Sequence, residues 1–218
     1  MITVFGEGRG FRVVWLLEEM GLPYRMRPVD LLAGADHDPE FLAANPAGFI
    51  PVLVDGDTTM VESIAILEYL TARSGPTPLA PDPQDPAFPA YLQFLHLGEA
   101  GLAGPINVIV ASEILAPETE RKNWSTGWAL RTFESRRGLV ARQLACSPYL
   151  AGETFTAADI SVTYALEFAH RTGNTVLSEA ERTYVARTTG REAYLRAMET
   201  CRATKAWAAE VAARETTA

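Results

Sequence analysis

The chain has 218 residues, of which 48% are hydrophobic and 21% charged, with a formal net charge of -8 and an isoelectric point near 5.0. This composition is typical of folded globular proteins. The acidity argues against a general nucleic-acid surface, which needs clustered lysine and arginine. No signal-peptide pattern opens the sequence, and no unbroken apolar run approaches the roughly 18 residues that span a bilayer. We therefore expect a cytoplasmic protein without nucleic-acid or membrane partners.

The first 75 residues alternate strand and helix patterns. The expected strands are 2–5, 24–29, 51–54 and 58–61, and the expected helices are 10–20, 39–44 and a segment that starts at 63. A helical crossover makes the first two strands parallel, whereas the Asp55-Gly56-Asp57 turn makes the last two an antiparallel hairpin. The order βαβαββα therefore predicts a mixed sheet.

A proline-rich segment, residues 74–86, marks a linker, and helical spacing follows it almost to the C-terminus. We expect an α/β domain at 1–75, a linker at 76–86 and an all-α domain at 87–218. The expected helices run from Pro86 to about Ser112, from about Pro117 to Ala145 and from Thr156 to about His170, with a last apolar stripe of Tyr194, Ala197, Met198 and Cys201. Gly98, Gly101 and Gly104-Pro105 are expected to bend or split the first of these helices.

The sequence FTAADI has the pattern of a helix start. Thr156 is the expected N-cap, Asp159 reaches back from the third helical position, and Phe155 packs on Ile160. We therefore assign Asp159 to folding and not to chemistry.

The stretch from Asn45 to Ser63 has the features of a peptide-binding edge. A proline that opens a strand removes one backbone donor, so Pro51 leaves the polar groups of Ile50 facing outward, where an extended ligand can pair with them. The simpler interpretation is that Pro51 only starts an edge strand. Ser63 is the expected N-cap of the next helix, and helix starts attract carboxylates.

Cysteine and histidine are few and scattered. Cys146 and Cys201 form no CxxC motif, and His37, His96 and His170 lie far apart, so the sequence predicts no metal site.

The segments NPAGFIPVL, VESIAILEYL and LAGETFTAADIS, with the βαβαββα order, the linker and the helical second half, resemble the soluble glutathione transferase family over essentially the whole chain. The resemblance implies a thioredoxin-like N-terminal domain, an all-α C-terminal domain that supplies the electrophile pocket, and a homodimer. It implies that the glutathione thiolate is conjugated to a small hydrophobic electrophile, as in detoxification, without a metal.

The resemblance also assigns the glutathione contacts. It implies a cis peptide bond before Pro51, a backbone pairing of Ile50 with the cysteinyl part, and capture of the γ-glutamyl end by Glu62 and Ser63. Phe49 stands where relatives often have lysine, which implies a weaker contact to the glycyl end. His37 lies in the loop where relatives often have a basic residue for the glycyl carboxylate.

The usual activator of the thiol is missing. Relatives use a tyrosine that ends the first strand, or a serine or cysteine in the next turn, whereas Phe5 and the turn GEGRG provide neither a hydroxyl nor a thiol. We expect Arg9 and the Gly10 amide to stabilise the sulfur anion, since a charge-assisted hydrogen bond and a helix N-terminus together supply about 3 kcal/mol. Arg9 is alternatively a solvent-facing turn residue.

Arg12 is a further cationic candidate. Its alternative role is a structural salt bridge with an acid such as Glu19 or Asp159. The expected second-substrate residues, each equally compatible with a core position, are Phe5, Glu99, Leu102, Ile106 and Trp207.

Two rival functions stay open besides conjugation. One is a non-catalytic relative that binds glutathione or hydrophobic molecules, or acts as a dimeric interaction module. The other is glutathione-dependent isomerase, dehalogenase, peroxidase or ether-cleaving activity, because a fold does not choose among these.

Overall fold

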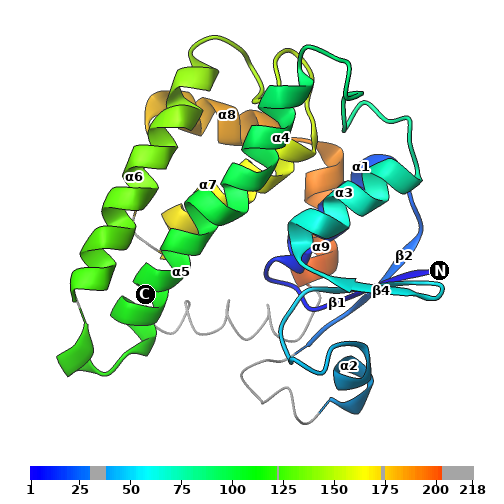
Figure 1. The fold of residues 1–218 in the computed structure, drawn as a ribbon, viewed down its shortest axis with the longest axis horizontal. Helices are drawn as coiled ribbons and strands as arrows, with labels where there is room; N and C mark the ends of the chain where they lie inside the picture. Colours follow the sequence, from blue (N-terminus) through cyan, green and yellow to red (C-terminus); the bar gives the residue numbers. More distant parts are fainter. Residues whose placement is uncertain (30–37, 122, 173–174, 203–218) are drawn as a thin grey trace. The chain divides into compact units, whose positions relative to one another are not determined.

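The computed structural model describes residues 1–29, 38–121, 123–172 and 175–202 (Figure 1). The chain divides into two compact units, one formed by Met1–Ser74 with the segment from Gly190, and the other by Gly75–Thr189. The expected domain limits stay a prediction. In this division the segment from Gly190 groups with the α/β unit and not with the other helices.

The first unit contains the predicted mixed sheet. Its elements are β1 (Ile2–Phe5), α1 (Gly10–Met20), β2 (Tyr24–Arg27), α2 (Pro39–Ala44), β3 (Val52–Asp55), β4 (Thr58–Val61), α3 (Ser63–Arg73) and α9 (Glu192–Arg202). The strand order is β2-β1-β3-β4, with β1 parallel to β2 and antiparallel to β3, and with β3 and β4 forming the hairpin. The thioredoxin-like prediction is therefore confirmed, although β2 ends two residues early and β3 starts one residue late.

Helix α9 lies alongside α1 (Figure 1) because aromatic and charged side chains join them. The Tyr194 ring meets Phe11 and Trp15 edge-on, with centroids 5.3 and 4.9 Å apart. Arg191 donates two hydrogen bonds to the Glu19 carboxylate, at 2.6 and 2.7 Å. These contacts explain why a C-terminal helix belongs to the α/β unit.

The second unit is helical, as predicted. Its elements are α4 (Phe88–His96), η2 (Leu97–Ala103), α5 (Gly104–Val110), η3 (Ala111–Leu115), η4 (Glu118–Glu120), α6 (Trp124–Leu144), α7 (Ala157–Thr172) and α8 (Glu179–Thr189). Two predicted starts are wrong. Asp85 caps a turn by accepting from the Ala87 amide, so α4 begins at Phe88. The Asn123 side chain accepts from the Thr126 amide, so α6 begins at Trp124.

The predicted break near Gly98 is replaced by a change of helix type. Residues Leu97–Ala103 and Ala111–Leu115 form π-helix, so Phe88–Leu115 runs on as one 28-residue helix. By length and composition alone this helix is long and apolar enough to cross a membrane, which the sequence analysis did not anticipate. It packs against α6 and α7, so its apolar side chains contribute to the core of the helical unit.

Helix α7 is the buried centre of the helical unit, and residues 157–166 are all buried. The predicted cap is confirmed, because the Asp159 carboxylate accepts from the Thr156 amide at 2.8 Å. The same carboxylate accepts from the Leu150 amide and the Tyr184 hydroxyl, both at 3.0 Å. Burial raises the pKa of Asp159 to about 6 despite these hydrogen bonds. Asp159 is therefore a structural residue.

We expect Gly98→Ala to destabilise the helical unit. A Cβ at Gly98 would lie 2.2 Å from Ser161 Oγ and 2.6 Å from the Ser161 carbonyl carbon, so the two helices would have to separate. Such overpacking costs about 1–3 kcal/mol. The matched control is Gly138→Ala on the exposed face of α6, where a Cβ meets nothing within 4 Å and alanine stabilises the helix. Chemical denaturation compares the variants, and equal unfolding free energies for both would contradict this packing.

Candidate functional site

The predicted binding residues gather at one edge of the sheet. The register pairs Phe5 with Val52 and Val52 with Val61, so β1 ends, β3 begins and β4 ends at the same level. Pro51 and Glu62 directly adjoin the Val52–Val61 pair in the chain. Helices α1 and α3 both begin at this edge, after Arg9 and Glu62 respectively. Two helix N-termini therefore place partial positive charge at one end of the sheet.

The segment before β3 offers free backbone to a ligand. The Ile50-Pro51 peptide bond is cis. Ile50 belongs to no strand, and no backbone hydrogen bond within the described ranges uses its N–H or its carbonyl. Its side chain is half-buried against a hydrophobic cluster that contains Phe5, Phe41 and Val52. It also lies over Gly6, where a Cβ would be 2.2 Å from Ile50 Cγ2. Ile50 is thus held through its side chain while its backbone polar groups stay available.

Asn45 fixes the loop that leads to Ile50, although it was not among the expected binding residues. Its side chain is buried, donates to the Phe49 carbonyl at 2.7 Å and accepts from the Ala47 amide at 3.1 Å. The short spacing of Asn45, Pro46 and Gly48 is typical of such a side-chain-supported turn, so the signal was present in the sequence. Phe49 itself is 40% exposed.

The junction between β4 and α3 is strained. Glu62 has φ +68°, which makes it the one non-glycine residue with positive φ in the described part of the chain. Such a conformation costs about 1–3 kcal/mol and clusters at ligand sites. Glu62, not Ser63, is the N-cap of α3, so the predicted capping role of Ser63 is wrong by one position. Glu62 is exposed, whereas Ser63 is the first helical residue and is 3% exposed.

Arg12 connects the two helix starts. Its side chain is fully buried, and its Nη1 donates to Ser63 Oγ at 3.1 Å. The acids that we considered as its partners are engaged elsewhere: Glu19 binds Arg191, and Asp159 binds groups of the helical unit.

The structure around the turn after β1 does not support all the roles that we expected for Phe5, Arg9 and Gly10. The Phe5 ring is buried in the core, 6.3 Å from the Phe41 ring, which fits the alternative that Phe5 is a core residue. The Gly10 N–H already donates to the Glu7 carbonyl at 2.5 Å, so the expected role of this amide as a sulfur donor does not fit the geometry. Arg9 is half-buried at the N-cap of α1. Arg9 and the α1 dipole therefore remain the candidates for stabilising an anion here.

Comparison with known proteins identifies the family. The family model for the glutathione S-transferase N-terminal domain matches residues 2–72. Glutathione S-transferase 3 of Schizosaccharomyces pombe is 30% identical over 177 residues, which cover 75% of this chain and 71% of that protein. The chain belongs to the glutathione transferase family. The resemblance noted in the sequence is thereby confirmed.

Solved glutathione transferases share the fold. One from Methylococcus capsulatus has a TM-score of 0.80 at 23% identity, over 92% of this chain and 98% of that one. The transferase URE2P6 of Phanerochaete chrysosporium, solved in complex with oxidised glutathione, has a TM-score of 0.78 at 24% identity, over 92% and 96%.

Two of the residues that were expected to bind a second substrate lie in the core of the helical unit. Leu102 and Ile106 are fully buried in the helical unit, which fits the core alternative. Glu99 is half-buried in the π-helical segment η2 and stays a candidate. His37 and Trp207 lie outside the described residues.

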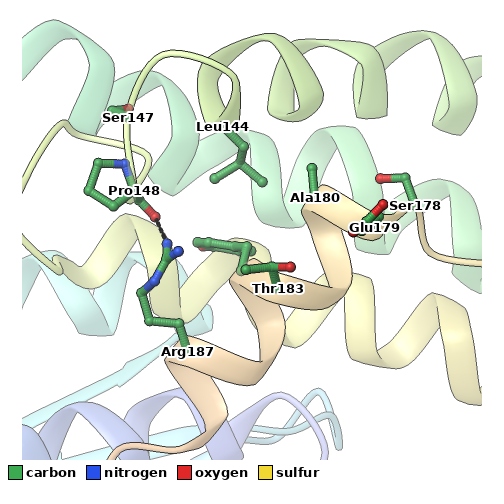
Figure 2. A pocket seen from close by; sticks show the side chains of 9 residues that line it. Leu144, Ser147, Pro148, Ser178, Glu179, Ala180, Thr183 and Arg187 are labelled. Carbon is green, nitrogen blue, oxygen red and sulfur yellow. Dashed lines mark hydrogen bonds between the residues drawn. The ribbon is translucent and has the colours of Figure 1, made fainter.

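A cavity in the helical unit is lined by none of the described residues that were expected to bind a second substrate. It is lined by the end of α6, residues 147–148 and one face of α8 (Figure 2). Arg187 lines one side of the cavity and donates to the Pro148 carbonyl at 2.5 Å (Figure 2). Among the residues that the structure describes, no group of three histidine, cysteine or acidic side chains could hold a metal ion.

Proposed function

We propose that this glutathione transferase binds glutathione along the edge formed by Ile50, Pro51, Glu62 and Ser63. The observation that carries the proposal is the Val52–Val61 pair, which closes the β3–β4 hairpin directly next to Pro51 on one strand and Glu62 on the other. The backbone of Ile50 can pair with the cysteinyl part as an added strand would. The Glu62 carboxylate can receive the ligand ammonium, and the start of α3 favours its carboxylate.

The proposed reaction is attack of the glutathione thiolate on a small hydrophobic electrophile. An ordinary thiol has a pKa of about 8.5, so only a few per cent is ionised at neutral pH. Arg9 and the α1 N-terminus supply positive potential at the end of β1. The structure of URE2P6 with oxidised glutathione supports the choice of ligand class. The expected homodimer rests on the family alone and the expected cytoplasmic location on the sequence pattern, and both stay predictions.

One observation favours a second candidate, a relative that binds glutathione without activating it. The Glu7 side chain is buried in the turn after β1. Burial and the Glu7 charge together raise the pKa of the Cys201 thiol to about 12. The same carboxylate would oppose ionisation of a glutathione thiol placed near this turn, since like charges disfavour each other.

Calorimetric titration with glutathione tests the binding site. We expect Ser63→Ala and Glu62→Gln each to weaken binding by about tenfold or more, because one tenfold step corresponds to the roughly 1.4 kcal/mol of a single charge-assisted hydrogen bond. Ser74→Ala, at the exposed other end of α3, is the matched control and should bind like the wild type. Turnover of an aryl chloride with glutathione then separates the two candidate functions. Conjugation predicts product formation, whereas a relative that only binds glutathione predicts none. Unchanged affinity in both site variants would place the ligand elsewhere.

A further inference from the structure

Arg12 occupies a position that is unusual for an arginine. It is the third residue of α1 and has no exposed surface. A guanidinium is charged at every accessible pH and is costly to remove from water, so full burial needs compensating contacts. One such contact is with Ser63 Oγ on α3, at 3.1 Å and 51 positions away in the sequence.

The chemistry of this hydrogen bond fixes the direction of the Ser63 hydroxyl. A guanidinium has donors only, so Ser63 Oγ must be the acceptor. The hydroxyl then keeps its own proton for another partner. At the start of α3, beside the strained Glu62, the group that this proton and the helix dipole both favour is a carboxylate.

We propose that Arg12 is a positioning residue for the α-carboxylate of the γ-glutamyl group. It turns Ser63 into a hydrogen-bond donor toward the ligand and adds a buried positive charge behind it. This inference rests on the proposed glutathione site and adds to it the residue that recognises one particular group of the ligand. It differs from both roles considered from the sequence, a cation beside the sulfur and a salt bridge to Glu19 or Asp159.

Three ligands test the assignment: glutathione, the analogue with γ-aminobutyryl in place of γ-glutamyl, and the analogue with glutaryl in that place. The first analogue lacks only the α-carboxylate, and the second lacks only the α-ammonium. We expect wild-type protein to prefer glutathione over the γ-aminobutyryl analogue by about 10- to 100-fold in calorimetric titrations.

Arg12→Met should reduce this preference to below about threefold while leaving the preference over the glutaryl analogue unchanged, because the ammonium is assigned to Glu62. Arg25→Met, an exposed arginine on β2, is the control and should leave both ratios as in the wild type. An Arg12 that served only to join α1 to α3 would instead weaken all three ligands by the same factor. That result, or an unchanged preference in Arg12→Met, overturns the proposal.

Wild-type protein provides a second readout if Arg12→Met does not fold. The guanidinium nitrogen resonances of Arg12 should shift when glutathione is added and should shift much less with the γ-aminobutyryl analogue. Equal shifts with both ligands overturn the assignment. If wild-type protein binds none of the three ligands, the proposed function itself fails, which distinguishes the two outcomes.

Discussion

Gly6→Ala is expected to weaken glutathione binding on the order of 100-fold. Gly6 has φ +80°, and an added Cβ would lie 2.2 Å from Ile50 Cγ2 and 2.5 Å from Ile50 Cβ. The Cβ of Ile50 is attached to its backbone, so a new rotamer cannot relieve this overlap. The backbone that we assign to the cysteinyl part must therefore move, and loss of its two backbone hydrogen bonds, at about 1.4 kcal/mol each, corresponds to a loss of this size.

The control separates this displacement from backbone strain. Gly56 in the β3–β4 turn has φ +61°, and a Cβ there meets nothing within 4 Å. Gly56→Ala should lose about 1–2 kcal/mol of stability from the left-handed conformation alone and keep its affinity for glutathione. Calorimetric titration with glutathione measures the affinity of both variants, and thermal unfolding measures their stability. If Gly6→Ala binds as tightly as Gly56→Ala, the ligand does not use Ile50.

Arg137→Met is expected to destabilise the helical unit by about 3–5 kcal/mol, the usual cost of leaving a buried charge without its partner. Arg137 on α6 donates to both oxygens of Glu181, at 2.6 and 2.5 Å, and to the Val176 carbonyl at 2.7 Å. Glu181 is 1% exposed and also accepts from the Ser178 amide, which caps α8. The pair therefore fastens the start of α8 to α6.

The pH dependence of the free energy of unfolding gives this prediction a second readout. Burial pushes the pKa of Glu181 up, but hydrogen bonds from Arg137 and Ser178 outweigh it, so the pKa is lowered in the folded state. The ionised pair therefore stabilises the protein above the ordinary carboxyl pKa, and this contribution is lost as pH falls through the lowered value. Arg137→Met should remove that dependence. Arg136→Met, an exposed neighbour that donates to the Ala100 carbonyl, should cost less than about 1 kcal/mol. Equal losses in both variants would contradict the assigned role of Arg137.

Local patterns in the sequence were sufficient to predict most of the α/β unit. Strand alternation, the Asp55-Gly56-Asp57 turn and the helix over residues 10–20 each depend on a few neighbouring residues, and all three are found in the structure. The start of α6 was placed too early because Pro117 opens a short 3-10 helix, while the cap is formed by Asn123.

Contacts between distant segments could not be predicted in the same way. The placement of α9 beside α1 depends on Tyr194 and Arg191 meeting residues more than 170 positions earlier. Likewise, the Arg12 to Ser63 hydrogen bond joins two helices that no periodicity relates. The proposed binding edge could be predicted from the sequence because its residues are close together along the chain. The surroundings of the proposed thiol site depend instead on how the turn after β1 folds.

The state of the bound thiol tests the account most directly. Ultraviolet difference absorbance of the thiolate, followed against pH with glutathione bound to wild-type protein, reports that state without any substitution. We predict ionisation about one to two pH units below that of free glutathione, because Arg9 and the α1 N-terminus favour the anion. A bound thiol that ionises at the same pH as free glutathione, or higher, would contradict catalysis and leave this protein as a glutathione-binding member of its family.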